Sequence, residues 1–167
     1  MQLTIATMQD KYDDFNRKYW NGNLRTSQDV RFVLTDDKSQ LPSDAAAAFN
    51  CSWIDNANGV PVSSYDFSIV ILSDFAKTDL TANQLILHEM IHSELAQLLD
   101  VDEAHSKDPN FHSDTFEERR SQLSILVGYD IPDGNKNFVW SFGNVLRRRQ
   151  DCKSAFELTI GSSPGRS

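Results

Sequence analysis

The chain has 167 residues, of which 40% are hydrophobic, so it suits one folded domain with an adequate core and excludes wholesale disorder. Its 24 Asp and Glu outnumber 16 Lys and Arg, and the net charge of −8 disfavours a protein that coats nucleic acid generally, because phosphate contacts need clustered cations. The first ten residues lack the basic and apolar segments of a signal peptide, and no apolar run reaches the length of a membrane span. We therefore expect a cytoplasmic, intracellular protein.

The first half of the chain predicts one helix and three strands. Met8, Tyr12, Phe15 and Tyr19 recur at helical spacing, and the following Asn-Gly-Asn sequence can adopt the left-handed conformation that ends a helix. Because three strands close in sequence tend to pair as neighbours, we expect a small, mostly antiparallel sheet. The three strand candidates, separated by turn residues, are residues 30–35, 45–54 and 65–72.

The second half predicts two more helices with a polar loop between them. Residues 81–84 fit a capping box, and the helix that they open is expected to run to about Leu99. Residues 100–110 are polar and acidic and predict a loop. Asp114 and Glu117 form a second capping box, whose helix is expected to stop at Gly128.

The pattern weakens toward the C-terminus. Residues 138–142 favour a further strand, Arg147–Arg149 form a short basic run, and residues 161–167 have the composition of a disordered tail. The chain shows no internal repeat and no second domain, so we expect one domain over residues 1–160. Its two cysteines, Cys51 and Cys152, form no C-x-x-C pair, which excludes a zinc ribbon and favours free buried thiols.

The central feature of the sequence is His88-Glu89-Met90-Ile91-His92, inside the second predicted helix. Two histidines four residues apart project from one face of a helix, so two imidazole nitrogens can reach one small cation such as zinc. Leu85, Leu95 and Leu99 continue their stripe at helical spacing, which places the imidazoles in an apolar seam where they need partners. A metal ion supplies a partner to both, and Glu89 beside them can act as a general base.

The third ligand of such a site is expected downstream, since a catalytic zinc ion usually has three protein ligands. His105 lies in the middle of the polar loop, where a solvated histidine is the more common finding. His112 immediately precedes a helix that Phe116 can anchor to the core, and a rigid element is what a catalytic ligand needs. Glu117 and Glu118 remain alternatives, although acids in a first turn also complement the helix dipole.

Taken together, these segments resemble the SprT-like family of zinc metallopeptidases, to which the eukaryotic DNA–protein crosslink protease Spartan belongs. Residues 15–24 are similar to the family's first helix and Gly-containing turn, and residues 69–73 to the strand before the active-site helix. Residues 85–92 match the central helix. Residues 112–116, a histidine followed four residues later by phenylalanine, match the segment of the third ligand. The resemblance covers roughly residues 8–128, in the family's order.

The resemblance implies an α+β fold with a single zincin-like domain, in which the small sheet packs against the N-terminal helix and the active-site helix. It implies one catalytic zinc ion held by His88, His92 and His112, with Glu89 as the catalytic acid/base. The implied partner is a protein or peptide substrate. An association with DNA also follows from the family, although the net charge does not support it, and the zinc ribbon that many members carry is missing here.

The expected reaction is metal-assisted peptide hydrolysis, in which the metal acidifies a water molecule and Glu89 removes its proton. A substrate would lie extended along residues 65–72 if that strand is at the edge of the sheet. Tyr129 is a weak candidate for a second oxyanion donor, and a core aromatic is the favoured interpretation.

Three other functions stay open. One is a gluzincin-like regulatory protease with Glu117 or Glu118 as the third ligand. Another is a non-catalytic binding module that contains zinc, against which the general base Glu89 argues. The last is nucleic-acid binding through Arg147–Arg149, which the net charge disfavours.

Overall fold

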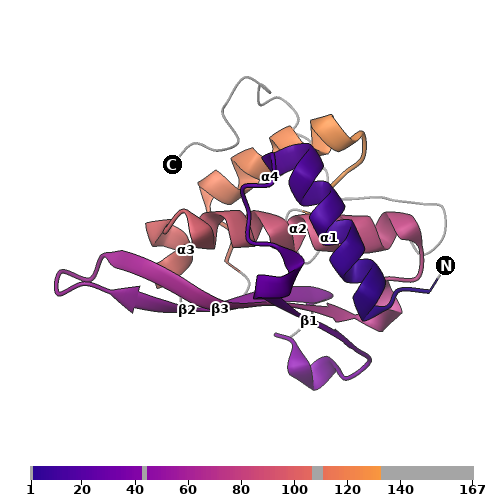
Figure 1. Ribbon diagram of the computed structural model, residues 1–167, viewed down its shortest axis with the longest axis horizontal. Coiled ribbons are helices and arrows are strands. Elements are labelled where there is room, and N and C mark those ends of the chain that lie inside the picture. The colour runs from indigo at the N-terminus through magenta and orange to yellow at the C-terminus, as the bar shows by residue number, and fades with distance from the viewer. Residues whose placement is uncertain (1, 43–44, 107–110, 133–167) are drawn as a thin grey trace.

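The computed structural model describes residues 2–42, 45–106 and 111–132. The α-helices α1 to α4 lie on one face of a three-stranded sheet, which makes the fold mixed α+β (Figure 1). In chain order the elements are α1 (Ile5–Trp20), β1 (Val30–Thr35), β2 (Ala47–Asp55), β3 (Pro61–Leu72), α2 (Asp79–Gln97), α3 (Val101–His105) and α4 (Asp114–Val127). Short 3₁₀ turns cover Ser27–Asp29, Lys38–Gln40 and Ser73–Phe75.

The sheet has the strand order β1-β3-β2 and is not mostly antiparallel. β2 and β3 form an antiparallel hairpin, but β1 pairs with β3 in parallel, from Val30 opposite Phe67 to Thr35 opposite Leu72. The chain leaves β1, forms β2 at the far edge, and returns as β3 into the space between them. Residues 69–72 are buried, with Ile69 and Ile71 in the large core shared with the helices and Val70 and Leu72 in a second, small cluster with Leu41 and Ala48. This continuous apolar run is the reason why β3 takes the middle of the sheet.

The hairpin turn explains why β3 starts four residues earlier than the sequence predicted. The side chain of Asn56 accepts the backbone N–H groups of Asn58 and Val60. Gly59 has φ +75, a left-handed conformation that costs a glycine little. The two strands are therefore paired almost to the turn, up to Asp55 opposite Pro61.

α1 carries the aromatic stripe that the sequence predicted. Met8, Tyr12 and Phe15 are buried in the hydrophobic core, and Tyr19 packs partly buried against it. The helix ends where expected, because Asn21 adopts the left-handed conformation with φ 53.

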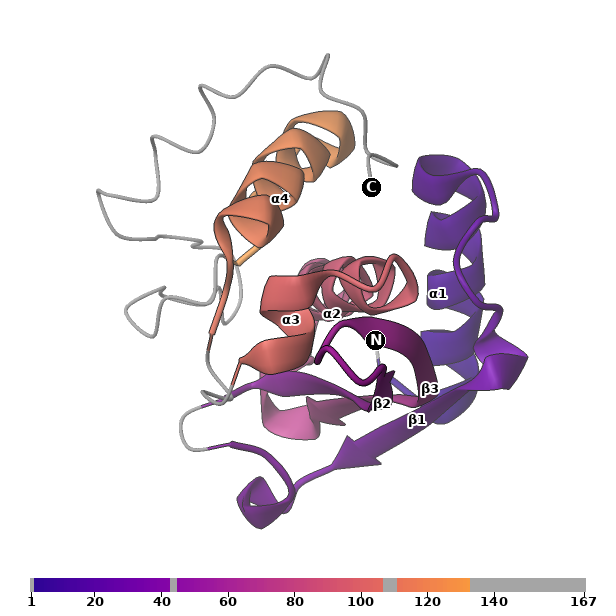
Figure 2. The ribbon, with the colours of Figure 1, turned by 90° about the vertical axis from the view of Figure 1, so that its left-hand side faces the viewer.

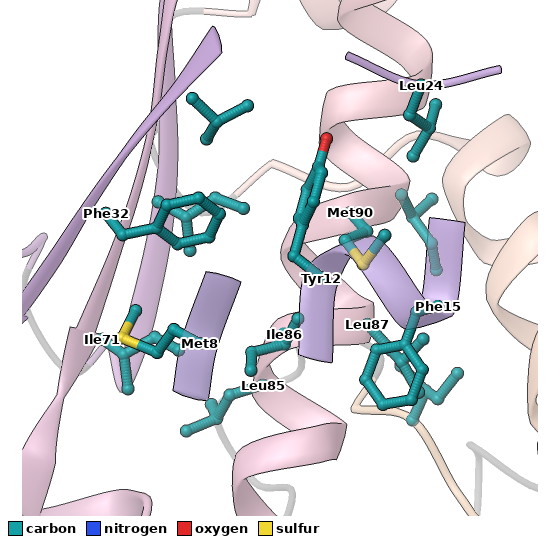
Figure 3. Packing of buried hydrophobic residues seen from close by; sticks show 14 of the residues in the cluster. Met8, Tyr12, Phe15, Leu24, Phe32, Ile71, Leu85, Ile86, Leu87 and Met90 are labelled. Carbon is teal, nitrogen blue, oxygen red and sulfur yellow. The ribbon is translucent and has the colours of Figure 1, made fainter. Parts of the chain in front are cut away.

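α2 is the central helix, packed against β2 and β3 on one side and against α1 and α4 on the others (Figure 2). Nearly every residue from Gln84 to Ala96 is buried, so the helix has no exposed face over this length. Figure 3 shows how its Leu85 and Ile86 meet Met8 of α1 and Ile71 of β3 in one apolar cluster.

Both predicted helix starts were misplaced, that of α2 by three residues and that of α4 by one. α2 is capped by Thr78, which forms its box with Thr81, and the helix starts at Asp79. It ends at Gln97, and Leu99 lies beyond it with φ 58 rather than on the apolar stripe. α4 is capped by the side chain of Ser113 rather than Asp114, because Ser113 accepts the N–H of Phe116, and it stops at Gly128 as predicted.

The predicted loop after α2 contains the short helix α3, capped by Asp100. The predicted strand 138–142, the basic run 147–149, Cys152 and the tail 161–167 lie outside the described residues. Cys51 is a free, partly buried thiol in β2, and burial raises its pKa to about 12. Of the helices described, none is both long and apolar enough to cross a membrane.

Candidate metal centre

Three histidines that are distant in sequence meet at one point of the structure. His88 and His92 project from α2, and His112 comes from the residue before the N-cap of α4. One ligand nitrogen of each lies within 4.8 Å of the others. The ring centroids are 5.3 Å apart for His88 and His92, and 5.0 Å for each of the two pairs with His112. These residues could hold a metal ion, although their arrangement does not identify the metal.

The spacing of the nitrogens fits a metal with imidazole ligands. At Zn–N distances of about 2.0–2.1 Å and a tetrahedral angle, two ligand nitrogens stand about 3.3 Å apart. The Nε2 atoms of His88 and His112 are 3.0 Å apart, close to that separation. This pair of nitrogens is therefore close to the separation that two ligands of one ion would have.

The hydrogen bond of His88 defines which ring nitrogen faces the site. Its Nδ1 is 2.6 Å from the backbone carbonyl oxygen of Pro132, which can only accept, so Nδ1 carries the proton. The lone pair is then on Nε2, toward the other histidines. Burial, together with the neighbouring His112 and His92, holds the pKa of His88 well below its ordinary value, so this ring is neutral near pH 7.

His92 has a carboxylate as its partner instead of a carbonyl. Its Nδ1 is 2.9 Å from Oε2 of Glu103, a residue of α3. Burial acts to lower the pKa of His92, but the charge and hydrogen bond of Glu103 and the charge of Glu89 outweigh it, and the pKa is raised. Sequence reasoning missed Glu103, although Asp100 and Glu103 have the spacing of a capping box and could have indicated α3.

His112 immediately precedes the N-cap of α4, and Phe116 anchors this helix in the core, as the sequence predicted. Phe116 is fully buried and lies under all three imidazoles, with centroid distances of 4.8 Å to His88, 4.4 Å to His92 and 4.6 Å to His112. The ring of Phe116 therefore packs against all three imidazoles and forms one apolar side of the site. An apolar surround of this kind strengthens electrostatic interactions at the site, because it excludes water.

Glu89 lies beside the histidines and is buried with them. Its Oε2 is 3.9 Å from Nε2 of His88. Burial raises the pKa of Glu89 to about 7, with Glu103 adding to the rise and His92 and a backbone hydrogen bond from Phe49 opposing it. A carboxyl group with a pKa near neutrality can both accept and release a proton there.

The other ligand candidates lie outside this group. His105 is about half exposed at the end of α3, with Nε2 3.5 Å from Oδ2 of Asp55, in keeping with a solvated histidine. Glu117 accepts a hydrogen bond from Nε of Arg120, and the described residues whose ligand atoms converge include neither it nor Glu118. Tyr129 packs against the hydrophobic core and hydrogen-bonds Asn83 in α2, which supports its interpretation as a core aromatic.

The predicted substrate edge at residues 65–72 is wrong, because β3 is the central strand and its two sides are taken by β1 and β2. The edge strand at the site is β2. Its Phe49 stacks on His92 with the ring planes 11° apart, and the backbone of Phe49 hydrogen-bonds Glu89. In the part of the chain that the structure describes, no strand pairs with the other side of β2.

The candidate functional features of this chain are therefore the histidine cluster, its buried carboxyl group and the neighbouring edge strand. No protein-family model, no curated protein and no solved structure gives a significant match to this chain.

Proposed function

We propose that the protein is a zinc-dependent endopeptidase with a zincin-like active site, of the SprT-like type that the sequence resembles. In this proposal His88, His92 and His112 hold one zinc ion and Glu89 is the catalytic acid/base. The observation that carries the proposal is the convergence of three imidazole nitrogens within 4.8 Å, with the carboxyl group of Glu89 3.9 Å from one of them. A purely structural metal site has no use for a general base.

The chain's own residues can supply the steps of peptide hydrolysis. Zinc, when bound, would act as a Lewis acid toward water and toward the scissile carbonyl group. Glu89 would accept a proton from the attacking water and return it to the leaving amine, and its carboxyl group lies 3.9 Å from Nε2 of His88, beside the ligand nitrogens. His88 presents a neutral ring with its lone pair toward the site, so it is ready to act as a ligand.

The substrate would be an extended segment of a protein. The side of β2 with which no described strand pairs offers backbone N–H and C=O groups to such a segment. Added strands gain affinity from main-chain hydrogen bonds without requiring one sequence. Phe49 joins this edge to the site through its contacts with His92 and Glu89.

Two measurements on purified full-length protein test the proposal. The first is the zinc content, and the second is metal-dependent cleavage of an unfolded protein, with and without DNA. Glu89→Gln is expected to retain zinc and abolish cleavage, because the amide cannot take up the proton. His112→Ala is expected to lose zinc, whereas His105→Ala, the matched control outside the cluster, retains it.

Other outcomes would favour the other functions. Zinc loss in Glu117→Gln or Glu118→Gln, with retention in His112→Ala, would indicate a gluzincin-like ligand set. A wild-type protein that binds zinc but cleaves nothing, even with DNA, would be a binding module. Cleavage only in the presence of DNA would show that the activity depends on DNA, in line with the association that the family resemblance implies.

A further inference from the structure

The two histidines of α2 are held by partners of different charge. Nδ1 of His88 donates to the neutral carbonyl oxygen of Pro132, and Nδ1 of His92 lies 2.9 Å from the carboxylate of Glu103. A carboxylate partner fixes the ring and tautomer of a metal-ligating histidine, and its charge makes the other nitrogen a stronger donor. A carbonyl fixes the ring without adding a full charge.

We infer that Glu103 is a positioning residue of the metal centre and that α3 serves to present it to His92. This inference rests on the proposed zinc site. In it, Glu103 does not touch the metal or the substrate. It orients His92 so that Nε2 points to the ion, and its negative charge raises the affinity of the site for a divalent cation.

The anchoring of α3 supports this role. A helix of five residues has no stability of its own, so its position depends on contacts with the surrounding structure. At its start, Oδ1 of Asp100 accepts the N–H of Glu103 itself at 2.9 Å. The backbone of Glu103 is thereby fixed at the start of the helix, whereas the contact of His105 with Asp55 at its end is 3.5 Å long and exposed on both sides, so it adds little.

The burial of Glu103 points in the same direction. Its side chain is 14% exposed, and Oε1 is buried without a hydrogen-bond partner among the described residues. Burying a carboxylate is unfavourable unless it is paired, and the partner that the structure gives its side chain is His92. An apolar residue would fill this place at less cost to folding, so the carboxylate fits a role at the site better than a role in stability.

The test compares three variants of the full-length protein by zinc affinity, measured in competition with a chelator. Glu103→Ala is expected to weaken zinc binding about 10–100-fold, the usual effect of losing such a partner. Glu103→Gln retains an oxygen that can accept from His92 but lacks the charge, so an intermediate loss is expected. Asp102→Asn, which changes the net charge equally at an exposed position of the same helix, is expected to bind zinc as the wild type does.

A second readout separates positioning from folding. The visible absorption of bound Co²⁺ reports the ligand field, so its bands are expected to shift in Glu103→Gln at full saturation, while circular dichroism of the metal-free protein stays unchanged. Glu103→Ala with an affinity within twofold of wild type would overturn the positioning role and leave the zinc site standing. Wild-type affinity in Glu103→Gln would overturn the role of the charge. A wild-type protein that binds no zinc would overturn the proposed function and this inference together.

Discussion

The two sides of α2 are built from different chemistry. Toward the sheet and α1 its neighbours are apolar, with Met8, Ile71 and Ile86 in one buried cluster (Figure 3). Toward α4 the apolar contacts of Phe116 and Leu123 are joined by a buried ion pair, in which Glu94 accepts a hydrogen bond from Nε of Arg119 at 2.8 Å. Apolar burial is non-directional, whereas ion pairs and hydrogen bonds require defined geometry.

The side with the buried ion pair is also the side on which the candidate metal centre lies. α4 begins two residues after His112, so the pair of Arg119 and Glu94 ties the segment with this histidine to α2. The next residue, Arg120, is fully buried and donates from Nη1 to the carbonyl oxygen of Ile131 at 2.9 Å. The carbonyl oxygen of the following residue, Pro132, accepts the hydrogen bond from Nδ1 of His88. Apolar packing therefore places α2, whereas directional polar contacts place the segments that meet its histidines.

The largest expected effect is that of Arg119→Ala, which leaves the buried carboxylate of Glu94 without this partner. Removing one member of a buried ion pair costs about 3–5 kcal/mol. Chemical denaturation of the metal-free protein measures the loss. The double variant Arg119→Met with Glu94→Leu is expected to be more stable than Arg119→Ala, because an apolar pair leaves no buried charge to compensate. A loss below about 1 kcal/mol in Arg119→Ala would contradict the ionic account of this side.

A somewhat smaller effect is expected on the apolar side. Ile86 is fully buried, and Ile86→Ala is expected to destabilise the protein by about 3 kcal/mol, because it removes buried methyl groups and leaves a cavity. Ile86→Val, the graded control, is expected to lose about 1 kcal/mol. The same denaturation experiment checks both variants. Equal losses for the two would show that volume does not decide stability here.

The smallest expected effect sharpens the link between α4 and the site. Ser113 is buried and caps α4, so Ser113→Ala is expected to cost about 1 kcal/mol, while Ser113→Asp retains a capping oxygen. Because His112 is the neighbouring residue, zinc affinity is expected to fall as well. Thr4→Ala removes the exposed cap of α1, and it is expected to lower the melting temperature without changing zinc affinity. Equal zinc affinity in Ser113→Ala and Thr4→Ala would show that the cap of α4 does not influence metal binding.

The sequence alone determined the features that depend on nearby residues. The aromatic stripe and left-handed end of α1, the strand at residues 30–35, the stop of α4 at Gly128, and the two histidines on one helix all follow from spacing over a few residues. These signals are reliable because a helix or strand repeats its geometry over short distances. The placement of Phe116 near His112 belongs here too, since four residues separate them.

The tertiary structure decided what depends on distant residues. The parallel pairing of β1 and β3, and with it the position of β2 at the edge, is set by which strands meet rather than by any one strand. The partners of the imidazoles come from separate segments: Glu103 lies 11 residues after His92, and Pro132 lies 44 residues after His88. A single sequence has no local pattern for such contacts, because they form only when the core brings the segments together.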